Sequence, residues 1–479
     1  MKRFSIYTLV VVMLFGAFSC EEKLDINTDP LASTSADPLT VIPYVQAAYM
    51  ARKETELGTR IMDVSQHFSA CFNSPRAGIT TSFLTGNTWF MYYSLVLGNL
   101  VLLEQDARAA GEVQNNVAAL AVIMKALAFY ELSVIFEDIP FTEALDGVNF
   151  PAPAFDTQET VLKGTVDMLD EAVALIGAIP DGAFPIGSVD FIYSGDMDLW
   201  ERFANSLQLR ILMIIRSADP GYALPRINTV LSRPLIENNT QVASFPFFNN
   251  VGNQNSFANL NNTFFGTENN EVVGVYAPSP VLRNLLVDNN DPRRDIFLTD
   301  INGGDDFDNP PMGSFSFGAF GAVISSNCIR YTYPSVWFTP AEVSFYRAEL
   351  ALDGDVAGDA DALTQQGVRQ ALEYWGGSID GATAAIAAAD IDAFVATFTG
   401  VTMNQLHEQQ YLETFMRPVV SWNHVRRTRV PELDEVPGSV IGDFLQRFSI
   451  APDEIGSNPN AADVQRADNG IPMWAFPIN

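Results

Sequence analysis

Apolar side chains recur at helical spacing along much of this sequence. One stripe, with an apolar residue at every fourth position, predicts a helix over about 196–216. Another helix is predicted after Asp156 and Glu159, because their spacing is that of a capping box, in which each side chain satisfies a free backbone N–H of the first turn. Thr339 and Pro340 have the residue types of the N-cap and first position of a helix. The same periodicity favours helices from about residue 40, over 362–375 and over 403–416.

The segment 117–136 is apolar throughout, with only Lys125 and Glu131 as charges. A charge at the centre of a bilayer costs about 2.5–3.5 kcal/mol, and Lys125 lies close to the middle of this segment. We therefore expect a buried helix of a globular fold here rather than a membrane span. Because amphipathic helices joined by short turns bury their stripes by stacking on neighbours, the fold is predicted to be mostly α, as in a helical-repeat array.

Residues 244–338 have a different composition. Asn, Gly and Pro are interspersed with Phe there, as in 244–250 and 315–320. Such a composition favours long loops and short hairpins and argues against helices. Because binding residues often lie on long loops held by a rigid scaffold, we expect this loop-rich insertion to contribute to a binding surface.

The first twenty residues have the pattern of an export signal. Lys2 and Arg3 precede an apolar run too short to span a bilayer, and small residues stand directly before Cys20. Cleavage there would leave Cys20 at the mature N-terminus, where bacterial lipoproteins are acylated, and each buried methylene of the acyl chains contributes about 0.8 kcal/mol to membrane attachment. The alternatives are a secreted protein with a cleaved peptide and a single membrane anchor.

The charge balance narrows the range of partners. The chain of 479 residues has a formal net charge of −30, and removal of residues 1–19 leaves 25 basic against 57 acidic residues, a balance of −32. Such a surface repels the phosphates of nucleic acids and anionic lipid headgroups, so neither is expected as a partner. No long linker interrupts the sequence. The predicted organisation is a signal peptide over 1–19, a lipidated tether over 20–39 and one domain over 40–479.

Common catalytic signatures are absent from the sequence, which contains neither G-x-S-x-G, H-E-x-x-H nor a P-loop. The spacing of His67, His407 and His424 indicates no shared metal. Composition does not test for a pair of glycosidase carboxylates, because such pairs are defined by their separation in space and 57 acids form pairs by chance. We therefore expect a protein that is not an enzyme.

Two further features leave alternatives open. Cys71 and Cys328 would be able to form a disulfide in an oxidising compartment, or they are two buried small apolar side chains. Side chains with oxygen ligands for calcium are clustered on a Gly-rich loop, but Pro310 and the lack of a distal Glu depart from the EF-hand pattern. A solvent-exposed acidic turn is therefore favoured over a calcium-binding loop, and no cofactor is expected. These oxygen ligands belong to Asn302, Asp305, Asp306, Asp308 and Asn309.

Carbohydrate binding requires aromatic faces that pack against the C–H surface of a sugar, together with polar groups that bind its hydroxyls. Two segments have this composition, although each ring has the alternative role of packing a loop onto the scaffold. Trp89 and Tyr93 fall at helical spacing and are expected in the core. The candidate ligand-binding residues are Phe72, Asn73, Arg76 and Phe83 in the first segment, and Tyr331, Tyr333 and Trp337 in the second, near Asn327 and Arg330.

Similarity to one known family is found, in that family's order, over 125–144, 155–172, 190–210, 342–349, 422–428 and 458–460. Together these segments resemble the SusD/RagB family of surface lipoproteins. Glu137 stands where that family usually has Gly before Asp-Ile-Pro, and the loop 244–338 has no clear counterpart. Trp422, Arg426 and Arg427 fall in a segment that resembles the family's scaffold, so they are excluded from the site.

The resemblance implies a helical scaffold that contains tetratricopeptide-like helix pairs and carries an irregular, loop-rich region. Members of the family act as lids over a SusC-like TonB-dependent transporter in the outer membrane, and they capture glycans or other nutrients without a catalytic centre. A lipid-anchored position on the cell surface and a glycan ligand are therefore expected. The alternatives are a peptide-binding member of the family, a surface-anchored glycan hydrolase, and a structural or adhesive lipoprotein with no small ligand.

Overall fold

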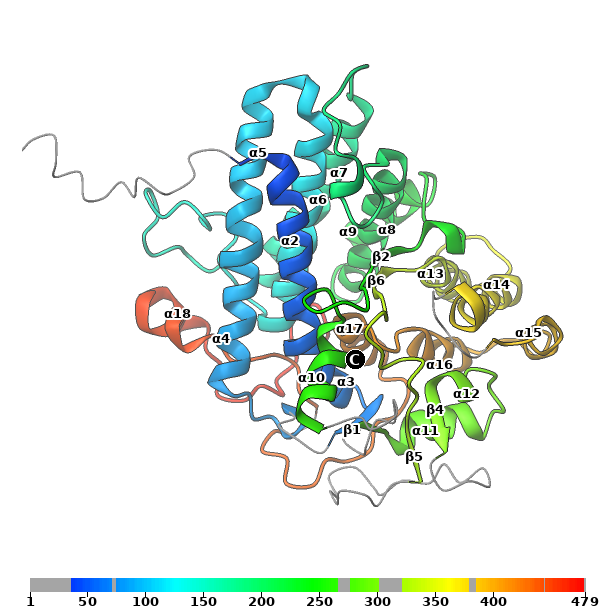
Figure 1. The fold of residues 1–479 in the computed structure, drawn as a ribbon. Helices are drawn as coiled ribbons and strands as arrows, with labels where there is room; N and C mark the ends of the chain where they lie inside the picture. The colour runs from blue at the N-terminus through cyan, green and yellow to red at the C-terminus, as the bar shows by residue number, and fades with distance from the viewer. Residues whose placement is uncertain are drawn as a thin grey trace, which may run out of the picture. The chain divides into compact units, whose positions relative to one another are not determined.

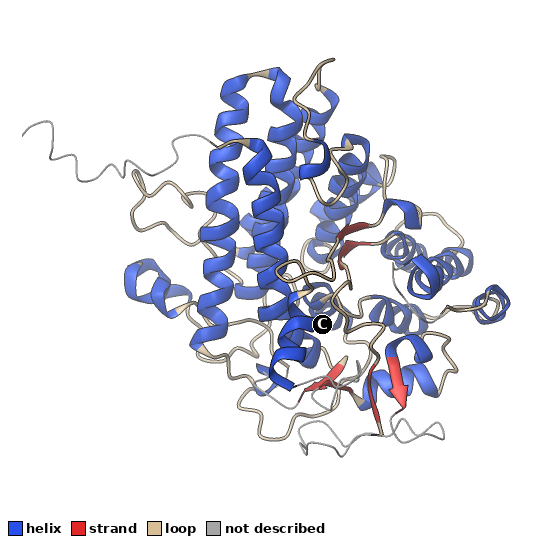
Figure 2. Ribbon diagram, viewed as in Figure 1, coloured by secondary structure: helices blue, strands red, loops and turns tan. Residues whose placement is uncertain are grey.

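Helices make up most of the fold, and the strands are short (Figure 2). The computed structural model describes residues 36–477 apart from 71–74, 266–275, 301–320, 379–384 and 443. The signal peptide, Cys20 and the acidic loop at 302–309 lie outside the described residues. The chain from Asp37 onward forms one unit.

The first half of this unit is a series of helices in which each packs against the next (Figure 1). Helix α5 contacts α6, α6 contacts α7, and the series continues through α8 to α9. Helix α2 packs along α5. These helices are α2 (Pro38–Lys53), α3 (Thr59–Val64), α4 (Ser82–Phe90), α5 (Gly98–Ala110), α6 (Asn115–Phe136), α7 (Gln158–Gly177), α8 (Met197–Ile215) and α9 (Pro220–Val230). Two π-helical turns, η1 (Glu54–Gly58) and η3 (Met91–Leu97), join α2 to α3 and α4 to α5.

A second group of helices follows the loop-rich region. Helix α13 packs on both α14 and α16, and α17 packs on α16 and reaches back to α3 and α6, so the two groups share one core. The short helix α18 lies beside α4 (Figure 1). These helices are α13 (Pro340–Leu352), α14 (Ala360–Glu373), α15 (Ala388–Val395), α16 (Met403–Glu413), α17 (Pro418–Thr428) and α18 (Pro452–Ser457).

Helix α6 is long and apolar enough to cross a membrane by length and composition, but 94 % of its most apolar window is buried inside the protein. Lys125 forms an ion pair with Glu104 of α5 at 2.6 Å. The prediction of a buried helix in a globular fold is confirmed, because the apolar faces of α6 pack on α5, α7 and α8.

The predicted cap at Thr339 is confirmed, and a second predicted cap is corrected. Asp196 accepts from the backbone N–H groups at the start of α8, and Thr339 caps α13 through the N–H of Glu342. The predicted capping box of α7 is wrong. Thr157 is the N-cap, and the carboxylate of Asp156 instead accepts from the N–H groups of 141 and 142, which ties the preceding loop to the helix.

The loop-rich region contains more helix than its composition predicted. Helices α10 (Ser256–Phe265), α11 (Pro280–Val287) and α12 (Arg294–Phe297) lie within it, so the expectation that it sustains no helix is wrong. Within the described ranges, six short strands form three antiparallel pairs, β1–β3, β2–β6 and β4–β5. The strands are β1 (Phe68–Ala70), β2 (Ala243–Phe245), β3 (Tyr276–Pro278), β4 (Leu298–Asp300), β5 (Ala322–Ile324) and β6 (Ser335–Phe338).

Candidate functional site

Two of the predicted ligand-binding residues lie at the start of the α4 segment. Phe83 is in the first turn of α4 and is 63 % exposed, so its ring is available to a ligand. Arg76 lies in a short 3-10 turn, and its guanidinium Nη1 is 2.5 Å from the Oδ1 of the interior Asp63. The carboxylate holds Arg76 in place beneath the surface. Phe72 and Asn73 lie outside the described residues.

The predicted aromatic residues of the second segment are mostly interior. Trp337 lies in β6 and is 2 % exposed, with its indole Nε1 donating to the Sδ of Met50 at 2.9 Å and its ring edge-on to Tyr49. Tyr333 is also 2 % exposed. A ring enclosed by protein cannot stack on a sugar, so both are core residues in this structure. Only Tyr331 is partly exposed.

A groove of about 300 Å³ runs between α4 and α18, with a loop from Pro140 to Pro153 at its side. We call it the α4 groove. Trp89 and Tyr93 were expected in the core, and Trp89 is indeed buried, but both contribute to the lining of this groove. The hydroxyl of Tyr93 donates to the carbonyl of Pro140 at 2.7 Å and so fixes the loop against the helix. The volume of the α4 groove lies at the lower end of the range for ligand pockets.

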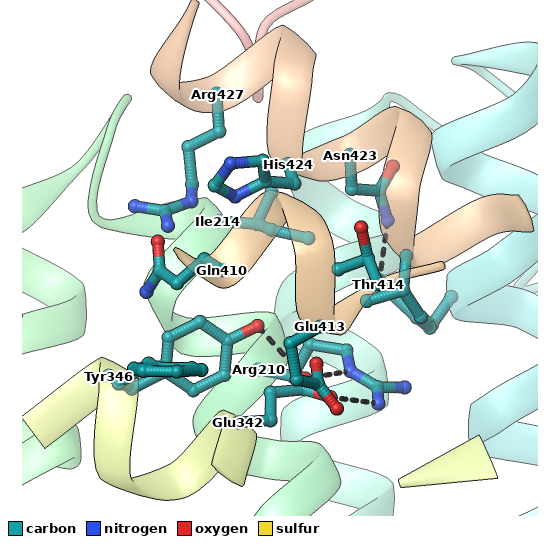
Figure 3. A pocket seen from close by; sticks show the side chains of 13 residues that line it. Arg210, Ile214, Glu342, Tyr346, Gln410, Glu413, Thr414, Asn423, His424 and Arg427 are labelled. Carbon is teal, nitrogen blue, oxygen red and sulfur yellow. Dashed lines mark hydrogen bonds and ion pairs between the residues drawn. The ribbon is translucent and has the colours of Figure 1, made fainter. Parts of the chain in front are cut away.

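A second cavity is enclosed among helices α6, α8, α13, α16 and α17 (Figure 3). Arg210 donates to Glu342 through Nε at 2.5 Å and Nη2 at 2.8 Å, and the Tyr346 hydroxyl donates to the same carboxylate at 2.9 Å. Arg417 bridges Glu342 and Glu413. The cavity is about 20 Å³, room for about one water molecule, so this cluster joins helices and does not hold a ligand.

Electrostatics keep Glu342 ionised. Burial acts to raise the pKa of Glu342, but the guanidinium groups of Arg210 and Arg417 outweigh it and lower the pKa to about 2. Glu349 forms a second cluster with Arg427 and with Arg216, and its pKa lies well below its ordinary value because Arg427 overcomes the effect of burial. These carboxylates are therefore counter-charges inside the scaffold, and their pKa values are unlike those of a general acid at neutral pH.

The histidines are closer together than their sequence spacing indicated. The rings of His407 and His424 lie 5.9 Å apart because α16 and α17 are neighbours, and His407 Nε2 is 3.6 Å from Glu349 Oε2. His67 Nε2 lies 2.9 Å from the carbonyl of Tyr411, which requires that this nitrogen carry the proton. Burial lowers the pKa of His67 to about 3. Within the described ranges, no three His, Cys, Asp or Glu side chains are grouped as metal ligands.

Cys328 is a buried thiol, and its Sγ lies 3.5 Å from the carbonyl of Ile296. Burial raises its pKa well above the ordinary value, which makes it unreactive as a thiolate. Cys71 lies outside the described residues. Their pairing stays a prediction.

A family model described as starch-binding and associating with the outer membrane matches residues 30–444. No curated protein matches the chain in sequence. Among solved structures, a chitin-binding protein has a TM-score of 0.79 at 20 % identity, covering 92 % of this chain and all of its own. A SusD-like protein from Bacteroides thetaiotaomicron has a TM-score of 0.75 at 20 % identity, covering 92 % of this chain and 99 % of its own.

A chitin-binding SusD homologue from Flavobacterium johnsoniae is also similar, with a TM-score of 0.72 at 18 % identity over 92 % of this chain and 97 % of its own. These similarities show a shared fold over 92 % of this chain. The match of the family model extends from the tether to the segment before α18. The chain therefore belongs to the SusD-like family of starch-binding proteins that associate with the outer membrane.

Proposed function

We propose that this protein is a lipid-anchored receptor on the cell surface that captures a glycan and delivers it to a SusC-like TonB-dependent transporter. The family's description as starch-binding and associated with the outer membrane supports this proposal. Two structurally similar proteins are named for chitin binding, which is consistent with a glycan rather than a peptide ligand. The observation that carries the proposal is the family match over residues 30–444.

The proposed ligand surface lies around Phe83. Its ring is largely exposed on the first turn of a helix whose buried face is anchored in the core, so it is presented on a rigid element. An exposed aromatic face is what a pyranose ring packs against. Of the other predicted residues that the structure describes, Arg76 and Tyr331 are partly exposed, whereas Tyr333 and Trp337 are interior. Phe72 and Asn73 remain part of the proposed site.

Attachment is proposed through acyl chains on Cys20. A membrane-bound position would place the receptor next to its transporter, and the acidic surface leaves the lipid as the source of attachment. Metabolic labelling with a fatty acid tests this directly. We expect label on the wild-type protein and none on the Cys20→Ala variant, which should be released from the membrane fraction. Label on both would refute acylation at Cys20.

The glycan test is calorimetric titration of the full chain with maltooligosaccharides and chitooligosaccharides. We expect at least one series to bind and to be recovered unchanged, and Phe83→Ala to weaken binding by about threefold to tenfold, the value of one aromatic contact. Deletion of the gene should abolish import of that glycan, and the protein should co-purify with an outer-membrane barrel. Turnover of the ligand would favour the hydrolase, and binding only to peptides would favour the peptide-binding alternative.

A further inference from the structure

The α4 groove has an aromatic wall that the predicted site does not include. Phe90, in the last turn of α4, is 48 % exposed and lines the groove. Behind it, Trp89 packs against Tyr93 with ring centroids 4.8 Å apart and edge-on against Phe136 at 5.0 Å. The buried rings hold α4 firmly, so the exposed ring is carried on an ordered helix. The π-helical turn η3 supplies Tyr93, and such turns are frequent at functional sites.

The opposite wall of the groove is acidic and polar. Asp453 and Glu454 lie in the first turn of α18, and Glu454 is oriented by a hydrogen bond of 2.9 Å from the side chain of Asn458. Ser94 adds a hydroxyl from η3. The residues lining the groove include these two carboxylates and no basic side chain. Carboxylates and hydroxyls bind sugar hydroxyls well, whereas the carboxylates repel uronate and sulfate groups.

One face of α4 connects this groove with the proposed glycan surface. Phe83 and Phe90 are seven residues apart, which places them two turns apart on the same side of the helix and about 10.5 Å apart along its axis. Gly86 lies between them, lines the groove, and has no atom within 4 Å of the position that a Cβ would occupy. The surface of α4 therefore has no side chain at Gly86, between the two exposed rings, which leaves room for sugar units that extend from one ring to the other.

We propose that the α4 groove is a second saccharide subsite, which binds the continuation of an uncharged oligosaccharide whose other part rests on Phe83. This inference depends on the proposed function. It adds the chemical class of the ligand, a neutral chain, and a minimum length, since a sugar that reaches from Phe83 to Phe90 must extend over two helical turns. Acidic chains are excluded from the groove by Asp453 and Glu454.

The test compares long and short neutral oligosaccharides on the full-length protein. Maltoheptaose and chitohexaose should bind more tightly than maltotriose and chitobiose in whichever series is recognised. Phe90→Ala should weaken the long ligand by about threefold to tenfold and the short one by less than twofold. Gly86→Leu, which fills the bare surface, should produce the same loss. Phe191→Ala removes a similarly exposed ring outside the groove and is the matched control.

The outcomes separate the two proposals. If the long ligand binds and neither Phe90→Ala nor Gly86→Leu changes its affinity, the subsite is refuted while the glycan receptor stands. If no oligosaccharide, neutral or acidic, binds the wild-type protein, the glycan receptor fails and the subsite fails with it, whereas binding of acidic chains alone refutes the subsite and leaves the receptor standing. The subsite is also refuted if a peptide binds in the groove, that is, if Gly86→Leu abolishes peptide binding and sugars do not compete with it. Thermal unfolding of each variant within about 1 °C of wild type excludes misfolding as the cause.

Discussion

The buried charge cluster of Figure 3 makes a sharp prediction about stability. Replacing Arg210 by Met keeps the volume of the side chain but removes three hydrogen bonds, two to Glu342 and one to the carbonyl of Trp337. Glu342 is then left with one arginine instead of two. Removing one partner of a buried ion pair costs about 3–5 kcal/mol.

The expected shift in melting temperature follows from the size of the domain. Unfolding entropy is about 2.1 cal/mol/K per residue, or about 0.9 kcal/mol/K for roughly 440 residues, so the loss corresponds to about 3–5 °C. Circular dichroism at the helical minimum measures it. The control is Arg369→Met, because Arg369 pairs with Asp392 at 2.7 Å but both side chains are exposed. That variant should change stability by less than about 1 kcal/mol.

A double variant distinguishes charge imbalance from lost packing. Arg210→Met combined with Glu342→Met removes both charges and leaves the pair of Arg417 and Glu413 intact. Buried ion pairs replaced by apolar residues are often neutral in stability, so the double variant should melt at a higher temperature than Arg210→Met alone. If Arg210→Met costs no more than Arg369→Met, or if the double variant is additive, the argument from buried charge is wrong.

Three other perturbations have expected outcomes. The pKa of His67 is about 3 in the folded state and about 6.5 in the unfolded state, so the unfolded state binds more protons below pH 6.5. Protonation of this group should therefore remove about 2 kcal/mol of stability at pH 5. The variant His67→Gln should show a smaller drop in melting temperature between pH 7.5 and 5. Trp337→Ala should lower the free energy of unfolding by about 3–5 kcal/mol in a urea titration, because the ring is interior. Gly367→Ala should destabilise by about 1–3 kcal/mol, since its Cβ would lie 2.6 Å from the Phe345 ring, whereas Gly177→Ala meets no atom and should not.

The helices were predictable from sequence because their signals are local. Thr339 and Asp196 sit next to the N–H groups that they cap, so their roles can be recognised within one turn of sequence. The same reading failed at Asp156, whose carboxylate is used by a loop 14 and 15 residues earlier in the chain. Helix α11 had an overlooked signal, since Ser279 followed by Pro280 is an N-cap and first position like those of α13.

The candidate site was less predictable, because composition does not reveal which side of an element faces solvent. Trp337 and Tyr333 have the chemistry of a sugar platform, but β6, which carries Trp337, is buried along its whole length, and Tyr333 is 2 % exposed. Phe90 had no polar neighbour in sequence to mark it, and its partners in the groove come from α18, more than 350 residues later. Helical spacing from Phe83 was the one signal that pointed to it, and following that stripe for two turns would have found the groove.

The distribution of arginines also bears on the class of ligand. Arg210, Arg417, Arg426 and Arg447 are each at most 2 % exposed, and Arg426 donates to backbone carbonyls of α6 and of the C-terminal segment, which joins parts of the chain about 300 residues apart. Arginines whose charges are buried and hydrogen-bonded inside the protein contribute little to the electrostatic field at its surface. A chain with a net charge of −30 that buries such cations presents mostly carboxylates to its ligands. Long-range repulsion would slow the approach of sulfated or uronate-rich polymers, which agrees with the neutral class of glycan proposed for the α4 groove.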